Sequence, residues 1–133
     1  MRRTLCVVLL LALTACAPVP APLSPEAQAA FHATRVVKVL DVVRDAAIAA
    51  NETLPPVIST ASTREVVLWH KTAVQTIQAV PNGWRDTVRA GLYRLTCDVR
   101  AGTGPCEPRL SPTEVQRLTP YVGLALVIMD EVK

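Results

Sequence analysis

The chain has 133 residues, of which 50% are hydrophobic and 4% aromatic, and its formal net charge at pH 7 is +3. This length allows one domain and excludes a large multidomain enzyme. The hydrophobic fraction excludes wholesale disorder. The lack of a sustained Gly-X-Y or heptad repeat excludes collagen and long coiled coils.

The first fifteen residues contain the three parts of a secretory signal. Two arginines follow the first methionine, residues 5–13 are apolar, and two small or polar residues precede Cys16. Extended as far as Ala17, the apolar run has 13 residues, fewer than the about 20 that a helix needs to span a bilayer. We therefore expect residues 1–15 to be a cleaved leader rather than a membrane-spanning anchor.

The end of this leader, Leu13-Thr14-Ala15-Cys16, resembles the lipobox of bacterial lipoproteins. The resemblance covers about the first sixteen residues and implies that Cys16 receives a diacylglycerol thioether and becomes the first residue after cleavage. In proteins of this class an aspartate after the cysteine favours the inner membrane, whereas Ala17 favours the periplasmic face of the outer membrane. Several acyl chains would hold the protein durably, because one chain binds only reversibly. The alternative is a plain signal peptide with a cysteine near its cleavage site.

The basic character of the chain belongs largely to this leader. Without residues 1–15, which contain two arginines and no acid, twelve basic and eleven acidic side chains remain, a net charge of +1. Composition therefore gives no support for nucleic acid as a partner. The partners that we expect are the membrane, through the lipid on Cys16, and an envelope protein or a glycan.

Two cysteines, Cys97 and Cys106, remain once the leader is removed and Cys16 is lipidated. They flank a turn-rich stretch in an exported protein, which predicts a disulfide. The alternatives are a redox pair or a zinc site that uses His32 or His70. A redox pair usually has CxxC spacing, and no further cysteine or histidine completes a metal pattern, so we expect neither a metal nor a cofactor.

Four prolines among small residues over 17–25 predict a semi-rigid tether of polyproline type. The expected organisation is a leader over residues 1–15, the lipidated cysteine and tether over 16–25, and a helical domain over 26–133.

Apolar residues recur every three or four positions in four segments of this domain, which predicts an all-α fold, a small four-helix bundle. The first helix is expected to begin with Ser24 as N-cap and Pro25 in its first turn, and to end near Asn51. The second begins at a capping box formed by Ser62 and Glu65 and ends before a Pro-Asn-Gly turn.

The third predicted helix runs from about Trp84 to Val99, with Trp84, Val88, Leu92, Leu95 and Val99 facing inward. The residues on its opposite side form a stripe: Arg85, Arg89, Tyr93 and Arg100. Such a stripe can bind an anionic glycan, a lipid headgroup or an acidic partner, although it is usually only the solvated side of an amphipathic helix.

The fourth predicted helix begins at a capping box that starts with Ser111. Pro120 inside a helix would cost ~3 kcal/mol, so we expect a short helix over 112–118 and a restart with Thr119 as N-cap. Residues 121–129 are apolar nearly all round, which indicates either the most buried element or one that meets a partner.

The sequence contains no HExxH, GxSxG, P-loop or GxGxxG motif. Asp41 and Asp45 lie one turn apart on a helix surface, which favours a solvated face over paired catalytic carboxylates. We therefore expect a binding, interaction or structural module of the envelope, without catalytic residues. The alternative is a small periplasmic enzyme, either a thiol-redox protein or a cell-wall hydrolase, and a hydrolase needs a cleft in which His32 or His70 meets an acid.

Overall fold

The computed structural model describes residues 22–80 and 82–132. These residues form four α-helices and no strand: α2 (Pro25–Asn51), α3 (Thr60–Ala79), α4 (Trp84–Thr96) and α5 (Pro112–Glu131). The prediction of a small all-α domain is confirmed. The expected leader, Cys16 and most of the expected tether lie outside the described residues. Among residues 22–80 and 82–132, none of the helices combines the length and the apolar character that a membrane span requires.

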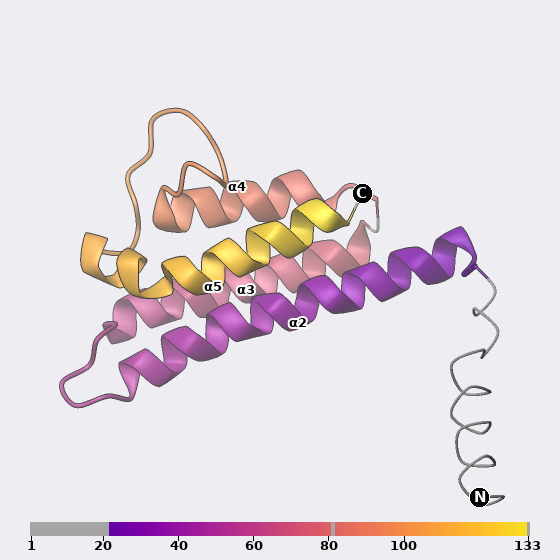
Figure 1. The fold of residues 1–133 in the computed structure, drawn as a ribbon. Coiled ribbons are helices and arrows are strands. Elements are labelled where there is room, and N and C mark those ends of the chain that lie inside the picture. Colours follow the sequence, from indigo (N-terminus) through magenta and orange to yellow (C-terminus); the bar gives the residue numbers. More distant parts are fainter. Residues whose placement is uncertain (1–21, 81, 133) are drawn as a thin grey trace, which may run out of the picture.

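Successive helices run in opposite directions along the bundle (Figure 1). α2 packs on both α3 and α5, α4 packs on α3, and α4 and α5 meet at few points. We call one end of the bundle the tether end, because α2 begins there, and it also holds the α3–α4 turn and the end of α5. The opposite end, the loop end, holds the loops over residues 52–59 and 97–111 (Figure 1).

The core consists of the apolar stripes of all four helices. Its most deeply buried side chains are Val36, Leu40, Val43, Val66, Ile77, Val88, Leu92, Leu118, Val122 and Met129. Ile58 and Leu110, one from each loop, close the core at the loop end. Full burial of such aliphatic side chains stabilises the fold by about 1.5–3 kcal/mol each.

α2 begins and ends where the sequence predicts. The hydroxyl of Ser24 accepts a 3.2 Å hydrogen bond from the N–H of Ala27, and Pro25 occupies the first turn, where its missing N–H leaves no gap. At the other end of α2, the Asn51 side chain donates a 3.0 Å hydrogen bond to the carbonyl of Ile58. This bond holds the 52–59 loop against the helix.

α3 begins earlier than predicted, and the expected capping box of Ser62 and Glu65 is wrong. Ser59 is the N-cap, and its hydroxyl accepts a 3.1 Å hydrogen bond from the N–H of Ser62. The Ser62 hydroxyl instead donates to Glu114 of α5 at 2.7 Å, and Glu65 accepts from Arg109 at 2.8 Å. Both side chains thus bond to residues of other elements and do not form a capping box.

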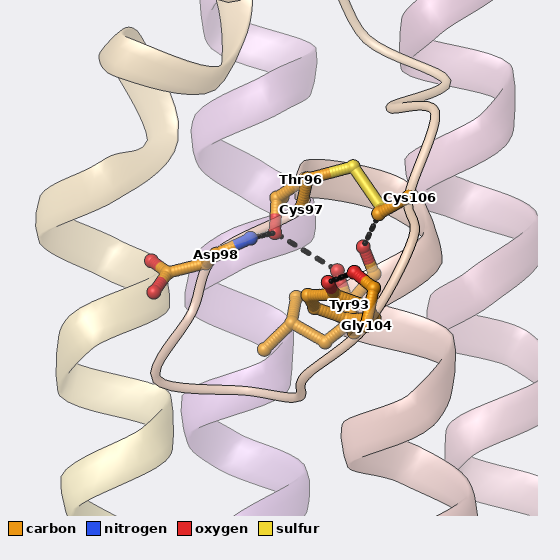
Figure 2. Close-up of a disulfide and its surroundings, with 7 residues drawn as sticks. Tyr93, Thr96, Cys97, Asp98, Gly104 and Cys106 are labelled. Atoms are coloured by element: carbon orange, nitrogen blue, oxygen red, sulfur yellow. Dashed lines mark hydrogen bonds between the residues drawn. A yellow bond between two sulfur atoms is a disulfide. The ribbon is translucent and has the colours of Figure 1, made fainter.

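α4 ends at Thr96, before the predicted end at Val99, which is 82% exposed rather than inward-facing. Cys97 has a left-handed backbone, with φ 55°, and its N–H bonds back to the last turn of the helix at 2.7 Å. Cys97 is joined to Cys106 (Figure 2), so the predicted disulfide is confirmed. The bridge fastens the 97–111 loop to the end of α4.

α5 is one helix rather than two. Its start at the capping box of Ser111 and Glu114 is confirmed, but the predicted break before Pro120 is wrong, because the helix continues to Glu131. Pro120 and Gln116, whose carbonyl loses its intrahelical partner, are both exposed. Water can satisfy that carbonyl, which lowers the cost of an interior proline.

The apolar run over residues 121–129 is buried on one side only. Val122, Ala125, Leu126 and Met129 belong to the core, whereas Tyr121, Leu124 and Val127 are between 39% and 55% exposed. The run is therefore not buried all round. Contact of its exposed side with a partner stays a prediction.

Candidate functional site

A groove of about 290 Å³ lies between α3 and α4. Its apolar lining consists of Leu68, Trp69, Ala73, Val88 and Leu95, and three threonines, Thr72, Thr76 and Thr87, add hydroxyl groups. An apolar surface with a few polar groups is typical of a ligand-binding site.

Gly91 allows α4 to lie directly against the Trp69 indole in this groove. A Cβ atom at position 91 would be only 2.9 Å from Cδ1 of Trp69. The indole has little freedom to move, because Trp69 is 8% exposed and its Nε1 donates a 3.4 Å hydrogen bond to the carbonyl of Val88. A larger residue at position 91 would therefore press α4 away from α3.

The loop end of the groove is charged. Arg109, from the 97–111 loop, donates a 2.8 Å hydrogen bond to Glu65 of α3, and Arg94, near the end of α4, lines the same groove. Two guanidinium groups against one carboxylate leave this mouth with a positive charge. Guanidinium groups bind carboxylates through charge-assisted hydrogen bonds, so the mouth suits an acidic group at one end of an apolar ligand.

Two arginines of the predicted stripe of Arg85, Arg89, Tyr93 and Arg100 bond to neighbouring elements. Arg89 donates to Asp130 of α5 and, at 2.6 Å, to the carbonyl of Arg100. Arg100 donates to Asp98 at 2.6 Å, and this hydrogen bond lowers the pKa of Asp98. These two arginines therefore join α4, α5 and the 97–111 loop.

The other two members of the stripe lie at opposite ends of α4. The hydroxyl of Tyr93 donates to the carbonyl of Gly104 in the 97–111 loop (Figure 2). Arg85 lies at the tether end, with its guanidinium carbon 5.9 Å from the Trp84 ring centre. Anion or partner binding by the four residues together stays a prediction.

His70 and Asp41 are brought together by the packing of α3 on α2. The distance between His70 Nε2 and Asp41 Oδ1 is 2.6 Å, and Arg44 lies 3.3 Å from the same carboxylate. Asp45 pairs with Arg44 at 2.8 Å, and this hydrogen bond raises the pKa of Arg44. The histidine–acid contact that a hydrolase requires is therefore present. Neither His70 nor Asp41, however, lines the α3–α4 groove.

His32 lies apart from this pair, in the wall of a cavity at the tether end. Within residues 22–80 and 82–132, no group of three histidine, cysteine, aspartate or glutamate side chains could hold a metal ion.

Glu114 connects two helices, whereas the sequence predicts for it only a role in the local cap of α5. It accepts hydrogen bonds from the N–H of Ser59 and of Ser111, both at 2.9 Å, and from the Ser62 hydroxyl at 2.7 Å. Burial by itself would raise the pKa of Glu114, but these hydrogen bonds outweigh it and hold the pKa at about 2. The ionised carboxylate therefore fastens α5 to the start of α3.

Sequence reasoning also missed the α3–α4 groove, because its walls come from two helices and a loop. One signal was available: a glycine inside an amphipathic helix, Gly91, often marks a close approach.

The fold therefore defines a small, disulfide-linked, all-α domain. Comparisons of this chain with protein-family models, with curated proteins and with solved structures find no match. Its function has to be argued from its own residues.

Proposed function

We propose that this protein is a lipid-anchored binding module of the bacterial envelope. The observation that carries the proposal is the sequence Leu13-Thr14-Ala15-Cys16 after a basic and apolar leader, which resembles a lipobox. Cys16 becomes the first residue and carries the lipid, at the periplasmic face of the outer membrane. The residues 17–24 that follow span at most about 25 Å as polyproline II, at ~3.1 Å per residue.

The direction of the bundle supports a binding role. The tether enters at the start of α2, so the loop end is the end farther from the point of attachment (Figure 1). The charged mouth of the α3–α4 groove, with Arg94 and Arg109, is at this loop end. A domain attached in this way presents the mouth to partners in the envelope rather than to the bilayer.

The groove favours a segment of an envelope protein over a glycan. Leu68, which is 53% exposed, gives its lining an apolar surface that matches apolar side chains, and the only side chains with a hydroxyl or amide group in the lining are three threonines. The two arginines match an acidic residue or a terminal carboxylate. The proposed partner is therefore a protein segment with apolar residues next to an acidic group.

Photocrosslinking from the groove tests this proposal. A photoreactive amino acid is placed at Thr72, which is exposed and lines the groove, in the full chain in intact envelopes. The same amino acid at Lys38, exposed on α2 and outside the groove, is the matched control.

We expect a defined adduct from position 72 that is absent from position 38. The adduct should disappear when Arg94 and Arg109 are both changed to Glu. Identical adducts from the two positions, no adduct, or an adduct that survives the charge reversal would contradict the proposed groove.

A further inference from the structure

We propose that the tether end of the bundle binds one phospholipid of the supporting membrane, with its phosphoethanolamine headgroup in one cavity and an acyl chain in the cavity beside it. The nearness of this site to a membrane rests on the proposed lipid anchor. Its ligand chemistry rests only on the residues at the tether end.

The first cavity, of about 380 Å³, lies between the start of α2 and the start of α4. His32 of α2 and Arg85 of α4 both line it. Nδ1 of His32 and Nε of Arg85 are buried and have no hydrogen-bond partner among the described residues. A buried polar group without a partner is unfavourable, so a ligand oxygen that bonds to these nitrogens after a small rotation of the half-buried side chains is favoured.

The charges in this cavity match a headgroup that carries both signs. Arg85 supplies a positive charge and His32 a ring nitrogen, and Asp86 in the same wall supplies a negative charge. A phosphate binds the two nitrogen groups through charge-assisted hydrogen bonds, and an ammonium group pairs with the carboxylate. Phosphoethanolamine carries these two groups two carbons apart.

A second cavity, of about 480 Å³, continues from the first between α2 and α3. The two cavities share Pro25, Ala29 and Asn82. The remaining residues of the second cavity are mostly apolar: Ala30, Ala33 and Ile77, with Glu26 and Gln78 at its polar edge. An acyl chain in this cavity is favoured because its CH₂ groups leave water.

Two exposed apolar side chains beside these cavities fit the same membrane contact. Leu23, just before α2, is 51% exposed, and Phe31, in its second turn, is 54% exposed. Leu23 lies at the end of the expected tether and Phe31 shortly after it, where a protein held through Cys16 would come closest to the lipid surface. Apolar side chains in that position bind at the boundary of headgroups and acyl chains.

The test uses the full chain with Cys16→Ser, which cannot carry the lipid, and dihexanoyl phosphatidylethanolamine below its micelle concentration. Binding is measured by calorimetry and by NMR shifts. We expect saturable binding that Arg85→Gln and His32→Gln each weaken at least fivefold. Arg94→Gln, in the α3–α4 groove, is the matched control and should bind as the parent does.

Other ligands separate the headgroup from the acyl chain. Glycerophosphoethanolamine and inorganic phosphate should bind at least tenfold more weakly than the lipid. Dihexanoyl phosphatidylglycerol, which lacks the ammonium group, should also bind more weakly. Ala30→Gln, at an exposed wall of the second cavity, should weaken binding of the lipid and leave glycerophosphoethanolamine unchanged.

A lipid that carries a nitroxide on its acyl chain tests the site without any substitution in the two cavities, so the result does not depend on whether such a variant folds. It should broaden the amide signals of Ala29 and Ala33 and spare that of Thr72. No saturable binding, equal weakening by Arg94→Gln, or phosphate binding as tightly as the lipid would overturn the proposal. Because the tested chain has no anchor, these outcomes leave the proposed lipidation of Cys16 unaffected.

Discussion

The hydroxyl of Ser62 donates a 2.7 Å hydrogen bond to the carboxylate of Glu114, which is 52 residues away in the chain. This bond joins the first turn of α3 to the first turn of α5, two helices that are not direct neighbours in the bundle. The same carboxylate accepts from the N–H groups of Ser59 and Ser111. One ionised side chain thus satisfies donors at two helix starts.

Replacing Glu114 by Gln tests this connection. The Gln amide has one acceptor oxygen, and its NH₂ group would face donors that now bond to the carboxylate. We expect the free energy of unfolding, measured with urea at pH 7, to fall by about 2–3 kcal/mol, because buried donors lose their acceptor. Glu107→Gln, in the exposed part of the 97–111 loop, is the control and should change stability little.

The pH dependence of stability provides a second test of Glu114. Its pKa is about 2 in the folded protein, below its ordinary value of 4.5, so the ionised form favours folding. This stabilisation is complete above the ordinary value and is lost as the pH falls from there toward 2. Between these two values the parent protein should lose more stability than Glu114→Gln does. Equal losses in the two proteins would contradict the role given to this carboxylate.

Gly91→Ala and Gly123→Ala form a matched pair of glycine substitutions within helices. At position 91 the new Cβ would lie 2.9 Å from the buried Trp69 ring, whereas at position 123 it would lie 2.6 Å from Nη1 of the half-exposed, flexible Arg100. Overpacking costs about 1–3 kcal/mol, whereas Ala in a helix gains up to ~1 kcal/mol over Gly.

Gly91→Ala should therefore lower the free energy of unfolding by about 1 kcal/mol, and Gly123→Ala should leave it equal or raise it. Urea denaturation measures both. If Gly91→Ala stabilised the protein, a methyl group would fit between α4 and Trp69, which would contradict the close contact described for the groove.

Removal of the bridge between Cys97 and Cys106 tests whether it is a structural disulfide or the redox-active pair of the alternative reading. Closing a loop of about ten residues stabilises a fold by roughly 2–3 kcal/mol on the chain-entropy model. We expect Cys97→Ser with Cys106→Ser to lower the melting temperature by on the order of 10 °C. An unchanged melting temperature with loss of a thiol–disulfide exchange activity would favour the redox protein instead.

The contact of His70 with Asp41 allows a direct test of the hydrolase alternative. In our account this pair holds α2 against α3, so Asp41→Asn should lower the free energy of unfolding by about 1 kcal/mol. Asp45→Asn, whose carboxylate pairs with Arg44 and is 63% exposed, should have a smaller effect. Release of fragments from purified peptidoglycan by the parent protein, lost in His70→Gln, would contradict this account.

Features that depend on neighbouring residues were predictable from the sequence. Ser24 and Pro25 start α2 because the cap and the first turn involve residues only three apart. The pairing of Cys97 with Cys106 follows from their spacing in a turn-rich segment. In these cases the physical cause lies within about ten residues.

Features that depend on distant partners or on exposure were not predictable in this way. Ser62 has the sequence signature of a cap, yet its hydroxyl bonds to Glu114 across the bundle. Pro120 has the signature of a helix break, yet the exposure of this part of α5 lets water satisfy the freed carbonyl. The α3–α4 groove likewise depends on a contact between two helices, in which Gly91 of α4 lies against Trp69 of α3.

The central claim is that Cys16 anchors this domain to the envelope, and the mass of the mature protein tests it most directly. The account predicts that protein purified from envelopes begins at Cys16 and carries a diacylglycerol on it. With Cys16→Ser this lipid mass should be lost, whereas Cys6→Ser, a cysteine in the expected leader, should leave it unchanged. A mature protein without lipid, or one that retains residues 1–15, would contradict the claim.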